Sequence, residues 1–431
     1  MRLATIVAIL PLAVTACSSS GGQSSGSTGN TSAVTEITAL VVSSPSASAL
    51  QKMAPSFTKE TGIKVNFIEV DYNASATKVL LSTRNNKGAY DVFQVDKPFF
   101  PQLGNAGALA SLDDNLKNDK TYDASDFSSQ ILEYQKYKGK TYGLALSTEP
   151  FVNWYRTDLF KAASIQPPTT WKQYADASAA LAAKGYYGSA FDYGPSQSAK
   201  YWAAMLYKNG GRLLNPETNA PELDTPVAKQ TMQMYIDLAK QTPALAINGD
   251  AGAGAQQVPA FEQLQVGQMV QNSGWYADLA DPSKSKVIGK FAAAPMPSDK
   301  VGQYEPANLL YGWQLAIPSD SKKQAAAWSF MTYVLSKANV GQFIDAGAPP
   351  PGRTSTANNP EYAAKLPYLK VMVDEAANAV ALPGIPDIAQ VITLISQQIS
   401  AMASNQVSVD QGLKNAQAAV TNTLKQDGVL K

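Results

Sequence analysis

Acidic and aromatic side chains at the ends of predicted strands are the residues of this chain best suited to bind a small polar molecule. Asp96 lies directly after an apolar segment, at the carboxyl end where open α/β sheets place ligands. Trp275 and Tyr276 follow a short apolar run, and Trp313 follows Gly312. Aromatic rings can cover the C–H faces of a sugar ring, and carboxylates bond hydroxyl groups. These residues are therefore candidates for contact with a small polar ligand.

Each of these side chains also has an ordinary structural interpretation. Arg353 follows a stiff Pro-Pro-Pro-Gly turn and could grip two hydroxyls with its forked guanidinium, or form an internal ion pair. Tryptophans are highly buried on average, and Lys97 could simply neutralise Asp96. Further candidates, each of which could contact a ligand or pack in the core, are Tyr72, Asn73, Asp192, Tyr193 and Trp202.

The chain contains no histidine and a single cysteine, Cys17. Ser-His-Asp and Cys-His arrangements are therefore excluded, as is every zinc site that uses histidine. We expect no catalytic residues, no metal and no cofactor.

The length and net charge of the chain limit its domain number and its partners. It has 431 residues, enough for two domains or one large one, and 45% are hydrophobic, which supports a substantial core. The formal net charge is +1, and no basic tract indicates a nucleic-acid partner.

The first 33 residues have the order of an export signal followed by a tether. Arg2 precedes an apolar run of about a dozen residues, which is too short to span a membrane. Val-Thr-Ala-Cys at 14–17 resembles the bacterial lipobox, whose cysteine is lipidated. We expect a signal peptide over 1–16, lipidation of Cys17 and a flexible Ser/Gly tether over 17–33; the alternative is a buried free cysteine.

The body alternates strands and helices, which indicates an α/β fold with a mainly parallel sheet. Strands are predicted at 37–42, 63–68 and 91–95, and shorter apolar segments at 267–270, 291–294 and 313–317. Helices are predicted between the first strands, after Thr170 and Thr225, and at 322–336, 360–374, 386–404 and 409–425.

Several segments, read in order, resemble the extracellular solute-binding proteins of ABC importers, in particular the carbohydrate-binding branch that includes maltodextrin-binding proteins. The resemblance covers essentially all of 33–431. It is carried by 57–65 (FTKETGIKV), 90–96 (YDVFQVD), 106–112 (AGALASL), 138–146 (KGKTYGLAL), 154–160 (WYRTDLF), 167–171 (PPTTW), 274–276 (GWY), 312–317 (GWQLAI), 325–330 (AAAWSF), 352–353 (GR) and 382–386 (LPGIP).

This resemblance implies a periplasmic-binding-protein-like fold: two α/β lobes, a central ligand cleft and crossing hinge segments. The first lobe would comprise 34–147 and 297–346, and the second 148–296 and 347–431. It also implies that Glu149, where the chain crosses between lobes, is an acidic ligand-binding residue, with a surface salt bridge as the alternative, and that Trp275 and Tyr276 lie on the cleft wall. Maltodextrin binders commonly carry aromatic residues in the stretch that corresponds to 387–393, which has none here. A monosaccharide, disaccharide or sugar alcohol is therefore favoured over a long oligosaccharide.

The function that this resemblance implies is ligand capture by hinged closure, with delivery to ABC permease subunits. We expect a monomer, lipid-anchored on the outer face of the cytoplasmic membrane, at the cell surface or in the periplasm. One alternative is a lipid-anchored glycoside-processing enzyme that uses Asp96 and Glu149 as a carboxylate pair. The other is a surface adhesin or structural lipoprotein.

Overall fold

A computed structural model describes residues 34–241 and 257–430, with only the backbone described at Tyr72 and Asn73. Cys17, the signal peptide and the tether lie outside the described residues. Within 34–241 and 257–430, no helix has the length and apolar character needed to cross a membrane.

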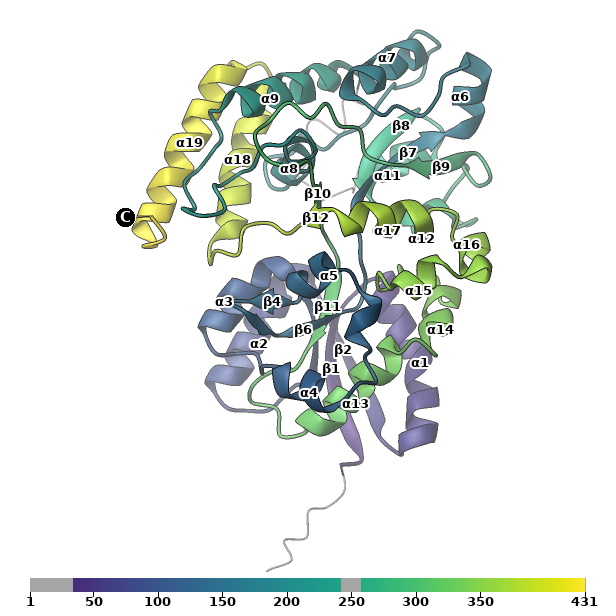
Figure 1. The fold of residues 1–431 in the computed structure, drawn as a ribbon, viewed down its shortest axis with the longest axis vertical. Coiled ribbons are helices and arrows are strands. Elements are labelled where there is room, and N and C mark those ends of the chain that lie inside the picture. Colours follow the sequence, from purple (N-terminus) through teal and green to yellow (C-terminus); the bar gives the residue numbers. More distant parts are fainter. Residues whose placement is uncertain (1–33, 242–256, 431) are drawn as a thin grey trace, which may run out of the picture. The chain divides into compact units, whose positions relative to one another are not determined.

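The first lobe is built on a five-stranded sheet with strand order β2-β1-β3-β11-β6 (Figure 1). β1 pairs in parallel with both β2 and β3, whereas β11 runs antiparallel to β3 and to β6. Its strands are β1 (Glu36–Val42), β2 (Lys64–Val70), β3 (Val92–Asp96), β6 (Gly143–Ala145) and β11 (Trp313–Ala316).

Alternation along β1 gives this sheet two buried faces. Ile37, Ala39 and Val41 belong to the core packed by α1 (Pro45–Thr61) and α13 (Gln324–Leu335). Leu40 points to the opposite face, with side chains from α2 (Tyr72–Arg84) and α3 (Phe100–Asn105). A strand buried on both faces reads as a continuous apolar run, which is why 37–42 could be identified from the sequence.

The second lobe contains a three-stranded antiparallel sheet with order β8-β7-β9. Its strands are β7 (Phe151–Arg156), β8 (Gln268–Asn272) and β9 (Phe291–Ala294). The expectation of a mainly parallel sheet is therefore wrong for β11 and β6 in the first lobe and for the β8-β7-β9 sheet, whereas β1, β2 and β3, and the short pair β10 (Asn308–Leu309) and β12 (Ala379–Val380), are parallel. Apolar patterning finds strands but does not fix their direction, which depends here on long excursions through helices.

Most of the predicted helices are present. Thr170 accepts a hydrogen bond from Gln173 N and begins α7 (Trp171–Ala182), and Thr225 caps α9 (Pro226–Leu238). The single helix predicted over 360–374 is wrong: it is split into α16 (Pro360–Lys365) and α17 (Leu369–Ala377). Pro367 explains the break, because proline removes a backbone donor and disfavours helical geometry in the residue before it.

The other elements of the described residues are short strands, helices and turns. The short strands are β4 (Lys136–Tyr137), β5 (Lys140–Thr141), β10 (Asn308–Leu309) and β12 (Ala379–Val380). The α-helices are α4 (Asp113–Asn118), α5 (Ser129–Tyr134), α6 (Thr157–Ala163), α8 (Ser198–Lys208), α11 (Gln257–Glu262), α12 (Tyr276–Leu279), α14 (Val340–Asp345), α15 (Thr354–Ala357), α18 (Ile388–Ala403) and α19 (Val409–Gln426). The 3-10 turns are η1 (Lys97–Phe99), η2 (Ala124–Asp126), η3 (Ala239–Gln241) and η4 (Ser273–Trp275).

Three connecting segments, 146–150, 308–313 and 348–353, are joined to one another by backbone hydrogen bonds. Leu146 N donates to Trp313 O at 2.8 Å, and Glu149 N donates to Tyr311 O at 2.8 Å. Thr148 N donates to Pro350 O at 3.2 Å. The candidate acids and aromatic residues near positions 149 and 313 are therefore held on a common backbone frame.

Candidate functional site

Glu149 is held where these connecting segments meet. Ser147 Oγ donates to Glu149 Oε1 at 2.5 Å, and the same hydroxyl accepts from Trp313 N at 3.0 Å. Gly274 lies against the other carboxylate oxygen: a Cβ built there would be 2.3 Å from Glu149 Oε2. The glycine of the Gly-Trp-Tyr motif therefore makes room for the carboxylate.

A second carboxylate influences Glu149. Asp96 ends β3 with 7% of its surface exposed, and it lies opposite Trp313 in the β3–β11 pair. Burial, together with the negative charge of Asp96, raises the pKa of Glu149 to about 7, although the hydrogen bond from Ser147 acts in the opposite direction. Near neutral pH, Glu149 can therefore accept a hydrogen bond when ionised or donate one when protonated. Both modes suit a hydroxyl group.

Lys200 adds a positive charge to this pair of acids. It lies near the start of α8, and its Nζ is 5.1 Å from the centroid of the Tyr311 ring. Burial lowers the pKa of Lys200, while the negative charge of Asp96 raises it. The site thus combines side chains from the first lobe, the second lobe and the connecting segments.

The predicted aromatic residues have different surroundings. Trp275 and Trp313 are partly exposed, so each keeps ring surface that a ligand could cover. Tyr276 packs in an aromatic cluster, with its ring centroid 4.5 Å from that of Tyr368, and its hydroxyl donates to Lys365 O at 3.4 Å. Tyr276 is partly exposed as well, but neighbouring rings pack against it, so Trp275 and Trp313 are the better candidates for stacking.

Gly312 is required by the backbone. Its φ is 147°, and a Cβ at this position would lie 2.2 Å from Ser147 O. Any side chain would force strand β11 away from the segment that carries Ser147 and Glu149. Gly312 therefore allows its own backbone and that of Ser147 to approach closely.

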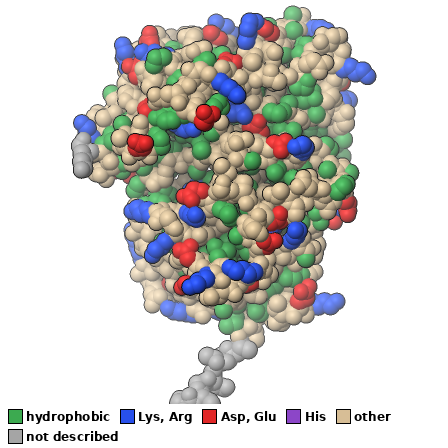
Figure 2. All heavy atoms as spheres, in the orientation of Figure 1, with side chains coloured by type: hydrophobic (Ala, Val, Ile, Leu, Met, Phe, Trp, Pro, Cys, Tyr) green, Lys and Arg blue, Asp and Glu red, His purple; other side chains and the backbone are tan. Residues whose placement is uncertain are grey.

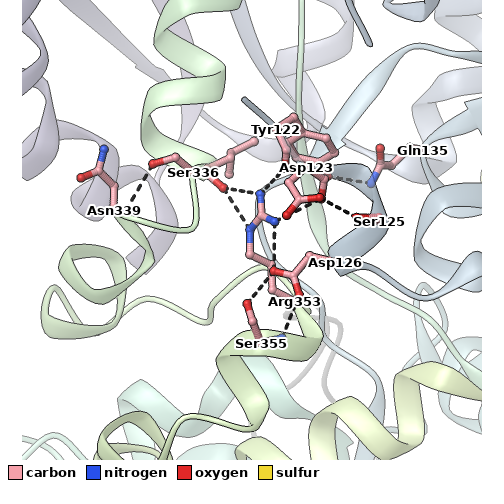
Figure 3. A network of polar contacts seen from close by, with 10 residues as sticks. Tyr122, Asp123, Ser125, Asp126, Gln135, Ser336, Asn339, Arg353 and Ser355 are labelled. Carbon is pink, nitrogen blue, oxygen red and sulfur yellow. Dashed lines mark hydrogen bonds and ion pairs between the residues drawn. The ribbon is translucent and has the colours of Figure 1, made fainter. Parts of the chain in front are cut away.

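Arg353 does not lie at the candidate site. Its side chain is fully buried, with 0% exposure, and Figure 3 shows its guanidinium surrounded by acceptors. Nε and Nη2 donate to Leu335 O at 3.1 and 2.7 Å, and Nη2 also donates to Tyr122 O at 2.5 Å. Nη1 donates to Asp126 Oδ2 at 3.2 Å and to Asp123 O at 3.4 Å. All five N–H groups are used, so none is left for a ligand.

The weaker candidates are mostly internal. Tyr193 is fully buried and donates to Tyr235 O at 2.9 Å, and Trp202 is fully buried in the core beneath α8. Asp192 is buried and accepts from Gly194 N at 2.8 Å, which closes a local turn. Tyr72 and Asn73 begin α2, but their side chains lie outside the described residues.

Sequence reasoning missed Ser147, Lys200 and Tyr311. Lys200 carried a usable signal, because it is a lone charge among buried residues, Ala199 and Tyr201–Tyr207. Ser147 and Tyr311 carried none, since their importance depends on which segments lie beside them.

Within 34–241 and 257–430, no group of three or more acidic or cysteine side chains is arranged to hold a metal ion. Figure 2 shows acidic and basic side chains interspersed on the visible face, as the near-neutral net charge predicts.

Known proteins match this chain both in sequence and in fold. The sequence model for bacterial extracellular solute-binding proteins matches residues 43–341. A probable amino-acid ABC transporter periplasmic-binding protein of Sinorhizobium fredii is 24% identical over 407 residues, covering 92% of this chain and 91% of that protein.

Two solved ABC transporter solute-binding proteins share the fold over nearly their whole length. One, from Agrobacterium radiobacter K84 in complex with ribitol, has a TM-score of 0.79 at 25% identity. The other, from Agrobacterium vitis S4 with bound D-mannitol, has a TM-score of 0.77 at 29% identity. Each comparison covers 91% of this chain and 99% of the other.

Proposed function

The chain belongs to the bacterial extracellular solute-binding proteins, and we propose that it is the receptor of an ABC importer for a small sugar or sugar alcohol. The observation that carries the ligand assignment is the meeting of Glu149, Asp96 and Lys200 beside the partly exposed ring of Trp313. The ribitol and D-mannitol bound by the two Agrobacterium proteins support this ligand class.

The chemistry of the site explains why a polyol suits it. An alditol presents a row of hydroxyl groups, each of which donates one hydrogen bond and accepts others. Ionised Asp96 accepts, Lys200 donates, and Glu149 does either, depending on its proton. An indole ring such as that of Trp313 can cover the C–H side of the same molecule.

The size of the ligand follows from residues away from the acids. Residues 387–393, which include the start of α18, carry no aromatic side chain, and Ile388, Val391 and Ile392 are buried in the core. This stretch therefore offers no ring on which a second or third sugar could stack. We propose a ligand of one or two sugar units, or a linear alditol.

Binding would proceed by closure of two lobes, comprising 34–147 with 297–346 and 148–296 with 347–431. The ligand would meet the groups of one lobe first, and closure would bring those of the other lobe onto it. The permease subunits of the importer would then recognise the closed form.

A tryptophan-fluorescence titration with ribitol, D-mannitol, D-tagatose, maltose and a set of L-amino acids tests this proposal. We expect saturable binding of at least one polyol or small sugar, and a higher melting temperature with that compound. Glu149→Ala should lose the binding while remaining folded. Binding of amino acids alone would overturn the ligand class, and conversion of a glycoside to products would indicate an enzyme.

We also propose that Cys17 carries the lipid that anchors the receptor to the outer face of the membrane. Expressed with its native signal in a bacterium that lipidates such cysteines, the protein should fractionate with membranes. Cys17→Ser should release it. Equal membrane association of both forms would contradict the anchor.

A further inference from the structure

The side-chain amide of Asn308 holds both polar backbone groups of Phe151. Phe151 N donates to Asn308 Oδ1 at 3.1 Å, and Asn308 Nδ2 donates to Phe151 O at 2.7 Å. Asn308 has 0% exposure, so these bonds are shielded from water. The amide therefore pairs with Phe151 as a neighbouring strand residue would.

The Asn308 side chain takes the place of strand β9, which ends before it reaches Phe151. Pro150 O accepts from Ser273 N and Arg156 N donates to Gly267 O, so the even-numbered residues of β7 direct their backbone groups toward β8. By alternation, Phe151 directs its groups toward the β9 edge. The ladder with β9 stops at the Asn153–Ala294 pair, two residues before it could reach Phe151. Asn308 satisfies the groups that β9 leaves open.

Asn308 is itself fixed by two further elements. Its backbone N donates to Asn378 O at 2.8 Å, and Leu310 N donates to Val380 O at 2.9 Å. Its Nδ2 also donates to Glu375 Oε2, and the Glu375 carboxylate accepts from Lys208 Nζ at 2.8 and 3.1 Å. The amide thus links β7, β10 and α17, with Lys208 at the end of α8 neutralising the buried acid.

The position of this link relative to the candidate site gives it a function. Phe151 is two residues after Glu149, and Asn308 is three residues before Tyr311. We propose that Asn308 is a positioning residue: without touching the ligand, it fixes Glu149 relative to Tyr311 and Trp313, and so determines ligand affinity. This inference rests on the proposed function.

Asn209 provides a matched control. It is also a buried amide, with 1% exposure, and it makes one bond of each kind: Nδ2 donates to Thr231 Oγ1 at 3.1 Å, and Oδ1 accepts from Asp299 N at 3.1 Å. Neither partner belongs to the connecting segments that carry Glu149 and Tyr311. A general loss of stability should therefore affect both variants alike, whereas a loss of positioning should affect only Asn308.

The experiment compares Asn308→Ala with Asn209→Ala in titrations with ribitol and D-mannitol, alongside their melting temperatures. We expect Asn308→Ala to weaken binding by about tenfold, the effect of roughly one lost hydrogen bond. Asn209→Ala should bind like the wild type although its melting temperature also falls. Equal affinities in the two variants would overturn the inference.

Hydrogen exchange in the wild type provides a second test. It needs no variant, so it applies even if Asn308→Ala does not fold, and it does not depend on which ligand the protein binds. In the ligand-free wild type, the Phe151 amide should exchange with solvent as slowly as those of Val152 and Trp154, because Asn308 accepts its hydrogen. Rapid exchange would overturn the inference. Slow exchange in a protein that binds neither polyol would instead count against the proposed ligands alone.

Discussion

Gly274→Ala should reduce ligand affinity while leaving the fold almost unchanged. The added Cβ would lie 2.3 Å from Glu149 Oε2 and 2.6 Å from its Cδ, where ordinary contacts begin at 3.4 Å. The carboxylate must therefore move by about 1 Å, and it loses its 2.5 Å bond to Ser147 Oγ. The backbone of Gly274 is not in the left-handed region, so alanine itself is tolerated there.

The size of the effect follows from the bonds that Glu149 would lose. A hydrogen bond to a charged group contributes about 1.5–3 kcal/mol, which corresponds to roughly 10- to 150-fold in the dissociation constant. Gly384→Ala is the control, because a Cβ there meets nothing within 4 Å. Titration of both variants with the best polyol measures the difference. If Gly274→Ala binds as tightly as Gly384→Ala, Glu149 is not a ligand contact.

Three further predictions concern stability and its relation to binding. Burial raises the pKa of Glu149 to about 7. The folded protein therefore holds this proton more tightly than the unfolded chain does. Protonation of Glu149 stabilises the fold at low pH, and this stabilisation is lost as the pH rises from about 4.5 to about 7. Melting curves at pH 5 and pH 8 should show a smaller decrease for Glu149→Gln than for the wild type; an unchanged decrease would contradict the raised pKa. Arg353→Ala should lower the free energy of unfolding in urea by about 3–5 kcal/mol by leaving Asp126 unpaired, while the folded fraction keeps its ligand affinity; weakened binding would return Arg353 to the site. Gly312→Ala should lower both the free energy of unfolding and the ligand affinity, because its Cβ would clash with a backbone atom, Ser147 O. Gly347→Ala is the control: its φ is also positive but the space around it is open, so it should lower stability alone. Equal ligand affinities in the two variants would refute this prediction.

Local patterns predicted the elements well where one signal dominated. The apolar run at 37–42 is a strand because it is buried on both faces, and Thr170 caps its helix as expected. The prediction of strand direction was wrong. The antiparallel placement of β11 depends on the path of the roughly 170 residues that lie between β6 and β11. The break at Pro367 was predictable from proline chemistry alone.

The candidate site was predicted in part, for the same reason. Asp96 and Gly312 follow from local rules about strand ends and glycines. Arg353 was misplaced because a Pro-Pro-Pro-Gly turn locates a residue along the chain but does not give the direction of its side chain. Lys200 and Asn308 could not be placed, since Asp96, whose negative charge acts on Lys200, and Phe151, which Asn308 binds, each lie more than 100 residues away in the sequence.

Equilibrium titration of the mature wild type and Glu149→Ala with ribitol and D-mannitol tests the central claim most directly. We predict saturable binding of a small polyol or sugar by the wild type and its loss in a variant that melts as a folded protein. Binding of equal strength in both proteins, or tight binding of an amino acid with no response to any polyol or sugar, would contradict the account.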